Sequence, residues 1–159
     1  MRNIRSSLAA PGASEARRLR EQILSLARSS SLRDPVSAMC EEAGFTPPQI
    51  HSLLWLGHDG PLTMGELSRR VGVTEKTGTG LVDRLELEGH VARERDPDDR
   101  RVVRARLTPR GVAVYRKLDA AIDQKLARVL GLLDPPDRRA QRRLLDKLGE
   151  RMGRLQEDA

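Results

Sequence analysis

Residues 62–111 read LTMGELSRRVGVTEKTGTGLVDRLELEGHVARERDPDDRRVVRARLTPRG. In the first half of this stretch, apolar residues recur every three or four positions, as they do on one face of a helix. After His90 the period changes to two, which is typical of a strand. The stretch therefore predicts helices followed by strands, with the change of structure near Gly89 and His90.

Two short helices are predicted in the first half. Thr63 followed by Glu66 is the pattern of a capping box, and Gly72 ends the first helix. Thr74 caps the second helix after a very short turn, and Gly89 ends it. The expected inner faces of the two helices are formed by Met64, Leu67, Val71, Leu81, Val82 and Leu85. Two helices joined by a tight glycine-containing turn predict a helix-turn-helix.

The second half predicts a β-hairpin directly behind the helix pair. The ranges 91–95 and 101–107 read as strands, and the turn-rich sequence DPDDR separates them. Val103, Ala105 and Leu107 are expected on one face of the second strand. An arginine-rich hairpin behind a helix-turn-helix makes a winged helix.

Further helices are predicted before this stretch. Residues 1–13 lack periodicity and are expected to form a flexible basic tail. A helix is predicted from Ser14 to the serine run that begins at Ser29. A short helix follows over 34–44, opened by an N-cap and a proline and closed by a glycine, and a third helix begins at Thr46 by the same device.

Two long helices are predicted after it. Thr108 and the proline that follows open the first, and the Asp-Pro-Pro sequence at 134–136 separates it from the second. Within one chain these helices have no core of their own to join. We therefore expect dimerisation helices at 14–45 and 112–159, on either side of a winged helix-turn-helix lobe at 46–111.

The charge balance points to a polyanionic partner. The chain has 159 residues, with 29 Lys+Arg against 23 Asp+Glu and a formal net charge of +6. Nucleic acid is the first candidate partner, although a GC-rich coding genome would also explain why most of the cations are arginine. The chain contains no long apolar run and no export or lipidation signal. We expect a soluble cytoplasmic protein with no membrane partner.

Residues 62–111 resemble the MarR family of winged-helix transcription regulators. The matching segments are LTMGELSRRVGVTEKT and LVDRLELEGHVARERDPDDRRVVRARLTPRG. A Thr-Pro-x-Gln-like opening of the leading helix, an Asp-x-Arg wing tip and a Leu-Thr-x-x-Gly start of a long helix occur in the family's order. With its flanking helices the resemblance covers residues 14–156. It implies a mainly α fold with a small β-hairpin wing and terminal dimerisation helices.

The resemblance also implies a homodimer that binds double-stranded DNA, more often as a repressor than as an activator. The operator would be a pseudo-palindrome, with recognition helices in the major groove and wings in the minor groove. Expected contacts from the recognition helix are Thr74, Lys76, Thr77, Thr79 and Arg84. Expected contacts from the wing are Arg93, Arg95, Asp99, Arg100, Arg101 and Arg104.

Roles within the wing follow from the same resemblance. Arg101 would insert into a narrow minor groove, and Asp99 would orient the wing through an arginine. The alternative for Asp96, Asp98 and Asp99 is that they neutralise a solvated turn.

The predicted recognition helix departs from the family at two glycines. Family members commonly have a small branched residue where Gly78 stands, and often an arginine where Gly80 stands. Each glycine costs roughly 1 kcal/mol relative to alanine in a helix interior. The missing arginine removes a guanine contact, so sequence readout would be weak, relaxed, or shifted to the wing and DNA shape. Gly78 falls on the inward side with Leu81 and Val82, where it would permit a close helix contact.

The family often binds small aromatic acids in a cleft between the DNA-binding lobe and the dimerisation helices. A small aromatic or other organic effector is therefore expected. The candidate cleft residues are Met39, Phe45, His51 and Trp55. A Trp at helical spacing from an aliphatic stripe is also a common core residue, and this alternative stays open for Trp55.

Two alternative functions stay open. Some relatives sense peroxides through a cysteine, and Cys40 is the candidate here, although Glu41 and Glu42 disfavour a reactive thiolate. No cofactor, metal site or enzymatic activity is expected, because the histidines are scattered and no catalytic motif occurs. A winged-helix adaptor that binds a protein partner, with weak DNA binding, is the remaining alternative.

Overall fold

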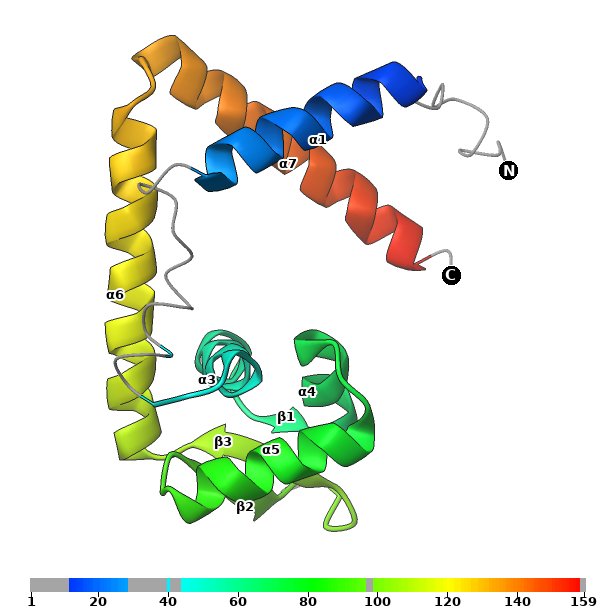
Figure 1. Ribbon diagram of the computed structural model, residues 1–159. Helices are drawn as coiled ribbons and strands as arrows, with labels where there is room; N and C mark the ends of the chain where they lie inside the picture. The colour runs from blue at the N-terminus through cyan, green and yellow to red at the C-terminus, as the bar shows by residue number, and fades with distance from the viewer. Residues whose placement is uncertain (1–11, 29–39, 41–43, 97–98, 158–159) are drawn as a thin grey trace.

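The structure is a computed structural model that describes residues 12–28, 40, 44–96 and 99–157 (Figure 1). It is mainly helical, with one small antiparallel sheet. The elements in chain order are α1 (Ala13–Arg28), α3 (Pro47–Asp59), β1 (Leu62–Thr63), α4 (Met64–Val71), α5 (Glu75–Leu87), β2 (Val91–Arg95), β3 (Val103–Leu107), α6 (Pro109–Gly131) and α7 (Pro135–Glu157). The winged helix is confirmed, and the short helix predicted over 34–44 lies largely outside the described residues.

The predicted helix ends in the helix-turn-helix are confirmed. The Glu66 carboxylate accepts from the Thr63 backbone N–H at 2.8 Å, and the Thr63 hydroxyl accepts from the Glu66 N–H at 3.2 Å. The Thr63 hydroxyl also donates to the Glu66 carboxylate at 2.8 Å, and the hydrogen bonds that this carboxylate accepts, from the Thr63 backbone first and from its hydroxyl second, lower the pKa of Glu66. Gly72 ends α4 with φ 77°, a left-handed conformation that glycine adopts without strain. The Thr74 hydroxyl caps α5 by accepting from the backbone N–H of Thr77.

The sheet has one more strand than the sequence predicted. Its order is β1-β3-β2, and all pairings are antiparallel. Strand β1 is only two residues long and pairs Leu62 with Ala105, so it is too short to show an alternating pattern. Strand β3 begins at Val103, two residues later than predicted, because the backbone N–H of Val102 closes the wing turn on the Asp99 carbonyl at 2.9 Å. Arg101 therefore lies in the wing turn.

One aliphatic core holds the lobe together. It joins α3, α4, α5 and the sheet to the first half of α6. Its buried side chains are Phe45, Ile50, Leu53, Leu56, Leu62, Leu67, Val82, Leu85, Val91, Ala105 and Leu118. Because Leu118 belongs to this core, the packing of the lobe extends into α6 beyond residue 111.

Helix α6 is fixed closely to the lobe at two glycines. A Cβ at Gly57 of α3 would lie 2.2 Å from Tyr115 Cδ2, so the two helices touch where no side chain fits. A Cβ at Gly111 would lie 2.0 Å from the carbonyl oxygen of His90. Helices α3 and α6 are therefore in direct contact at Gly57 and Tyr115.

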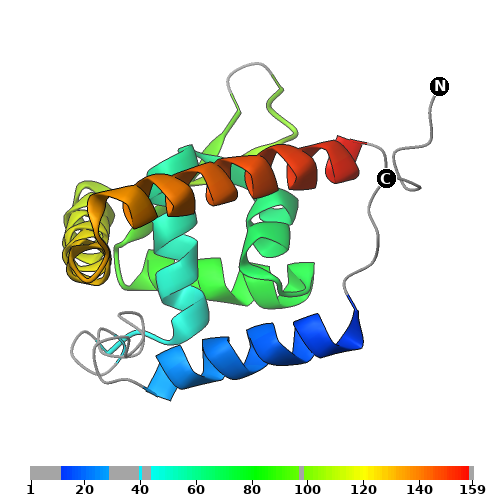
Figure 2. The same ribbon diagram turned by 90° about the horizontal axis from the view of Figure 1, so that it is seen from above.

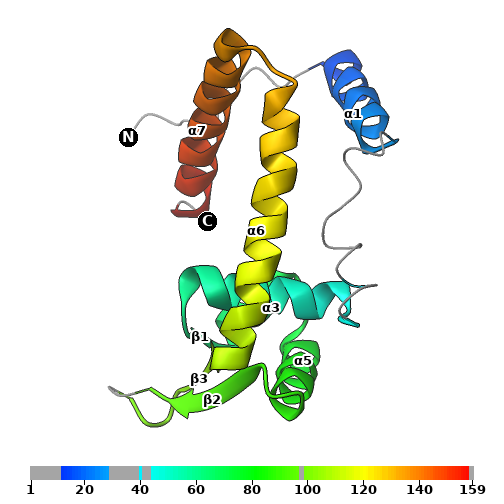
Figure 3. The same cartoon turned by 90° about the vertical axis from the view of Figure 1, so that its left-hand side faces the viewer.

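The terminal helices lie at the far end of α6, away from the lobe. They overlap in Figure 1, but Figures 2 and 3 show α7 and α1 on opposite sides of α6. Many of their apolar side chains are exposed, and so are several near the end of α6. These residues are Leu19, Ile23, Leu24, Leu126, Leu130, Leu132, Leu144, Leu145, Leu148, Met152 and Leu155. Within the described part of the chain, no helix is long and apolar enough to cross a membrane.

Candidate nucleic-acid interface

Helix α5 lies at the end of the molecule opposite α1 and α7 (Figure 1). Its inner face is formed by Gly78, Val82 and Leu85, all buried. The opposite face is exposed to solvent and includes Lys76 and Thr77. The β2–β3 loop extends from the sheet at the same end of the molecule, as Figure 3 shows. The fold therefore presents an open helix face and a wing on one side.

Three of the predicted recognition-helix contacts already make hydrogen bonds within α5. The Thr74 hydroxyl is the N-cap and also lies 3.0 Å from the Thr77 hydroxyl. The Thr79 hydroxyl donates to the Glu75 carbonyl at 2.9 Å. Thr74 therefore acts first as the cap of the helix, whereas Thr77 and Thr79 keep exposed side chains on its surface.

Arg93 links the wing to the recognition helix. Its guanidinium lies 2.6 Å from Asp83 and also pairs with Glu86, both on α5. The backbone N–H of Arg93 donates to the Glu86 carboxylate at 3.2 Å. Partial burial acts against the charge, but the hydrogen bonds and charges of the two carboxylates outweigh it and raise the pKa of Arg93. Arg93, predicted as a wing contact, is in the structure a bridge between β2 and α5.

Arg104, on the central strand β3, also connects two elements through ion pairs. Its Nε donates to Asp96, whose residue surface is only 9% exposed, and its Nη1 lies 3.6 Å from Glu66 of α4. The guanidinium therefore holds the base of the wing against the capping box of α4. Arg106 on the same strand pairs with Glu94 across the sheet.

The wing tip is held by two carboxylates that accept from backbone N–H groups, and one of them, Asp96, also binds a guanidinium. The Asp96 side chain accepts from the Asp99 N–H at 3.2 Å, and the Asp99 side chain accepts from the Arg101 N–H at 2.9 Å. Asp99, expected to orient the wing through an arginine, binds the backbone of Arg101, whereas Asp96 is the carboxylate that meets a guanidinium, that of Arg104. For Asp96, burial and this ion pair also argue against a merely solvated turn.

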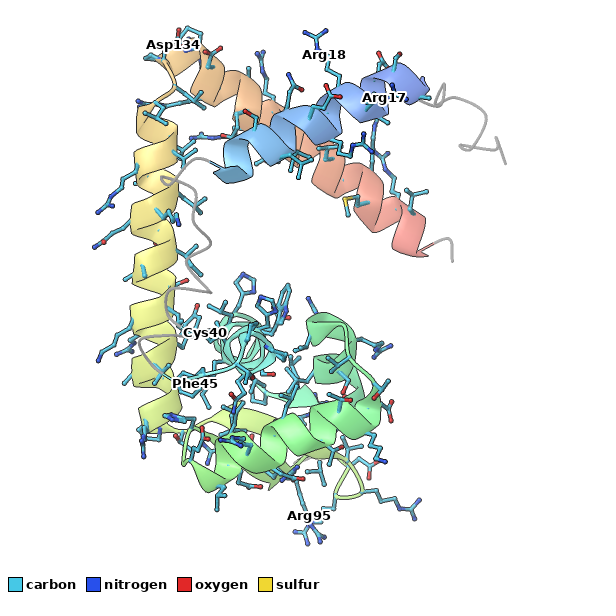
Figure 4. All side chains as sticks on the ribbon, viewed as in Figure 1. Arg17, Arg18, Cys40, Phe45, Arg95 and Asp134 are labelled. Atoms are coloured by element: carbon cyan, nitrogen blue, oxygen red, sulfur yellow. The ribbon has the colours of Figure 1, made fainter. Side chains whose placement is uncertain are left out.

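The predicted cationic contacts divide into two groups. The first group, called here the engaged cations, already forms ion pairs. Arg93 and Arg104 form the pairs described above, and Arg84 forms an exposed i,i+4 pair with Glu88 at 3.1 Å. The side chains of the second group have no ion pair or hydrogen bond to any described residue and are exposed. This group, called here the open cations, is Lys76, Arg95, Arg100 and Arg101. In Figure 4 the Arg95 side chain points away from the lobe, at the end remote from α1.

The two glycines of α5 have different surroundings. Gly78 is buried, and a Cβ there would lie 2.0 Å from the Ser68 hydroxyl oxygen. This confirms the inward position expected from the sequence. Gly80 is exposed, and a Cβ there would meet nothing within 4 Å. Space alone therefore does not require glycine at position 80.

The predicted effector residues do not all lie on an open surface. Phe45 is a core residue that is only 8% exposed. His51 is exposed, Trp55 is partly buried with the Arg70 guanidinium 5.1 Å from its ring centre, and Met39 lies outside the described residues. Cys40 is partly buried against the core. The described residues contain no group of three or more His, Cys, Asp or Glu placed to hold a metal ion.

His90 is a buried polar residue that the sequence did not single out. Its ring packs edge-on against Phe45, with 5.1 Å between the ring centres, and its Nδ1 has no hydrogen-bond partner among the described residues. Burial, and then the charge of Arg110, lowers the pKa of His90. His90 is therefore neutral at neutral pH, and it lies where α5, β2 and α6 meet.

Comparison with known proteins agrees with this geometry. The chain matches the MarR family over residues 45–103. The HTH-type transcriptional repressor Rv2887 of Mycobacterium tuberculosis is 36% identical over 118 residues, which cover 74% of this chain and 85% of the relative. The HTH-type transcriptional repressor MdtR of Bacillus subtilis is 33% identical over 93 residues, 58% of this chain and 60% of the relative.

Solved structures show the same fold along most of the chain. A MarR family protein from Bacillus stearothermophilus aligns with a TM-score of 0.76 and 32% identity, covering 91% of this chain and 99% of that one. A crystal structure of Rv2887 in complex with p-aminosalicylic acid aligns with a TM-score of 0.60 and 31% identity, covering 88% and 99%. The chain belongs to the MarR family of helix-turn-helix transcriptional regulators, which are DNA-binding proteins and not enzymes.

Proposed function

We propose that this protein is a homodimeric, ligand-responsive repressor that reads a pseudo-palindromic operator. Helix α5 enters the major groove, and the β2–β3 wing reaches the adjacent minor groove. The observation that carries the proposal is the separation of the predicted cationic contacts into engaged and open groups. Arg93 and Arg104 hold the two reading elements together, while the open cations keep their charge available for DNA.

The open cations suit two kinds of DNA contact. Lys76, near the N-terminus of α5, and Arg95, at the end of β2, are placed for phosphates or base edges. Arg101 is held at the wing tip by its backbone bond to Asp99, so its side chain is free to enter a minor groove. A guanidinium that forms no ion pair within the described residues gives up none when it binds a phosphate. This favours Arg95 and Arg101 over Arg93 as DNA contacts.

The exposed apolar faces of α1, α7 and the end of α6 support a dimer. Leu19 is 57% exposed and Leu144 is 59% exposed, although each lies on an amphipathic helix. Fully burying an exposed leucine contributes roughly 1.5–3 kcal/mol, and about half of that surface is still available on each of these side chains. A second copy offers the same faces and would cover them symmetrically. The two α5 helices would then read half-sites about one helical turn apart, roughly 34–36 Å.

A small organic acid is the proposed effector. The relative Rv2887 has been crystallised with p-aminosalicylic acid. In this chain Trp55 offers an aromatic face and the adjacent Arg70, which also pairs with Asp59 at 3.0 Å, offers a cation; the exposed His51 is also on α3. A ligand bound against α3 would act on α6 through the Gly57–Tyr115 contact and so change the spacing of the two α5 helices.

Selection of genomic fragments by the purified protein tests the proposal. At about 0.2 M salt purely electrostatic binding is suppressed, and we expect enrichment of one pseudo-palindrome. Adding p-aminosalicylic acid should then release the selected fragment. If no sequence is enriched and binding disappears with salt, the operator-reading repressor is rejected in favour of the winged-helix adaptor.

A further inference from the structure

Helices α4 and α5 approach each other closely at Ser68 and Gly78. The Ser68 residue is 1% exposed, and its hydroxyl has no hydrogen-bond partner among the described residues. A Cβ built on Gly78 would lie 2.0 Å from the Ser68 oxygen, 3.1 Å from its Cβ and 3.6 Å from its Cα. The hydroxyl therefore occupies the space that any side chain at position 78 would need.

Backbone conformation does not explain the glycine. The described glycines with positive φ are Gly44, Gly60, Gly72 and Gly89, so Gly78 has ordinary helical geometry that alanine also adopts. Glycine in a helix interior costs roughly 1 kcal/mol relative to alanine. Glycine at position 78 is explained instead by the close approach of α4, which leaves no room for a side chain there.

We infer that Gly78 and Ser68 form a matched pair that sets the separation of α4 and α5, and thereby the position of the outer face of α5 in the major groove. The pair acts as a specificity-determining positioning contact that touches no DNA itself. The inference rests on the proposed function, because it assumes that α5 reads bases.

The surroundings of the pair determine which helix moves when the contact is changed. Helix α4 is held at its start by the Thr63–Glu66 capping box and by Leu67 in the core. Helix α5 is held toward its C-terminal half, where Asp83 and Glu86 bind Arg93. Arg93 also donates to the Thr79 carbonyl at 3.5 Å, but the first turn of α5, which carries Lys76, lacks such a link among the described contacts. A side chain at position 78 would therefore displace mainly the start of α5.

Displacement of this segment should affect specific binding more than general DNA binding. Hydrogen bonds to base edges depend on distance and direction, so a small shift removes them. Phosphate contacts from long side chains such as Lys76 adapt to the same shift. The ratio of operator affinity to affinity for unrelated DNA is therefore the quantity that distinguishes positioning from a simple loss of folded protein.

Gly78→Ala, alone and combined with Ser68→Ala or Ser68→Gly, tests the inference on the full-length protein. Rotating the Ser68 hydroxyl away would still leave its Cβ 3.1 Å from the new Cβ, whereas glycine at 68 leaves only the Cα at 3.6 Å. We expect Gly78→Ala to lower the operator-to-unrelated-DNA affinity ratio about ten-fold. Ser68→Ala should restore part of the loss, and Ser68→Gly should restore most of it.

Gly80→Ala provides the stability reference, because it makes the same chemical change in the same helix at an open position. It should raise the melting temperature by about 2–8 °C, as expected for roughly 1 kcal/mol. Gly78→Ala should fail to give this rise, and adding Ser68→Gly should recover part of it, because the new glycine in α4 itself costs some helix stability.

Two results would overturn the inference. One is an unchanged affinity ratio in Gly78→Ala, and the other is an affinity ratio that falls equally in Gly78→Ala and in Ser68→Gly/Gly78→Ala. If Gly78→Ala does not fold, the double variant Ser68→Gly/Gly78→Ala decides the question. A folded double variant whose operator-to-unrelated-DNA affinity ratio is near that of the wild type supports the pair. A folded double variant with a low affinity ratio rejects it. A wild-type protein that selects no operator would instead defeat the proposed function.

Discussion

A guanidinium nitrogen of Arg93 on β2 lies 2.6 Å from a carboxylate oxygen of Asp83 on α5. With Glu86 as a second partner, this pair joins the strand that enters the wing to α5, the helix proposed to read the major groove. The two elements proposed to contact DNA are therefore tied together by ion pairs. In the proposed complex, the relative positions of the α5 face and the wing tip would depend on this link.

Replacing Arg93 by alanine should weaken the lobe. The residue binds two carboxylates but stays partly solvated, so we expect a loss of about 1 kcal/mol in the free energy of unfolding. The loss should appear in urea denaturation without DNA. Arg95→Ala is the control: Arg95 lies two residues further along β2, belongs to the open cations, and its loss should leave the unfolding midpoint unchanged. Equal stability of the two variants would show that Arg93 is not a structural link.

Replacing Arg101 by alanine should weaken operator binding by roughly 1–3 kcal/mol without unfolding the protein. Its side chain has no partner among the described residues, and its backbone is fixed by Asp99. Affinity for the selected operator and the circular dichroism spectrum give the two readouts. An unchanged affinity would reject the placement of the wing in the minor groove.

His90 should make stability depend on pH. Because burial lowers the pKa of His90 in the folded protein, the unfolded chain binds the proton first as pH falls. The free energy of unfolding should be level above about pH 7 and decrease from about pH 6.5 downward. His90→Gln should reduce this dependence between pH 7.5 and 5.5, a window above the range in which carboxylates such as Glu66 titrate. The same slope in both proteins would remove His90 as its cause.

The apolar face of α7 should be needed for the dimer. Leu148→Gln with Met152→Gln removes two exposed apolar side chains one helical turn apart. We expect this full-length variant to sediment as a monomer at micromolar concentration, where the wild type sediments as a dimer. Lys147→Gln with Arg151→Gln, each one residue earlier on the same helix, is the control and should stay dimeric. A dimeric Leu148/Met152 variant would place the interface elsewhere.

Local sequence signals predicted much of this fold. The caps at Thr63, Thr74 and Thr108 and the stop at Gly72 lie within a few residues of the groups they bind, so their spacing is visible in the sequence. The two-residue strand β1 was missed because its partner, Ala105, is distant in the chain and two residues carry no period.

The candidate site was predicted less completely. Exposure and residue type could identify arginines suited to DNA, but they could not separate Arg93 from Arg95. That difference depends on Asp83, ten positions away in the chain and on another element. The pairing of Arg104 with Asp96 instead of Asp99 is likewise set by the register of β3 and by the wing turn. Partners brought together by tertiary structure leave no local pattern.

The salt dependence of operator binding tests the division between open and engaged cations most directly. The logarithm of the association constant should fall linearly with the logarithm of salt concentration for the wild type. Arg95→Gln should reduce the magnitude of this slope by about 1 per protomer, or about 2 for the dimer, because one phosphate contact per copy is lost. Arg106→Gln removes the same charge from a residue that already pairs with Glu94, and it should leave the slope nearly unchanged. Equal changes of slope in the two variants would mean that binding follows net charge alone, and would contradict the assignment of the open cations as the DNA contacts.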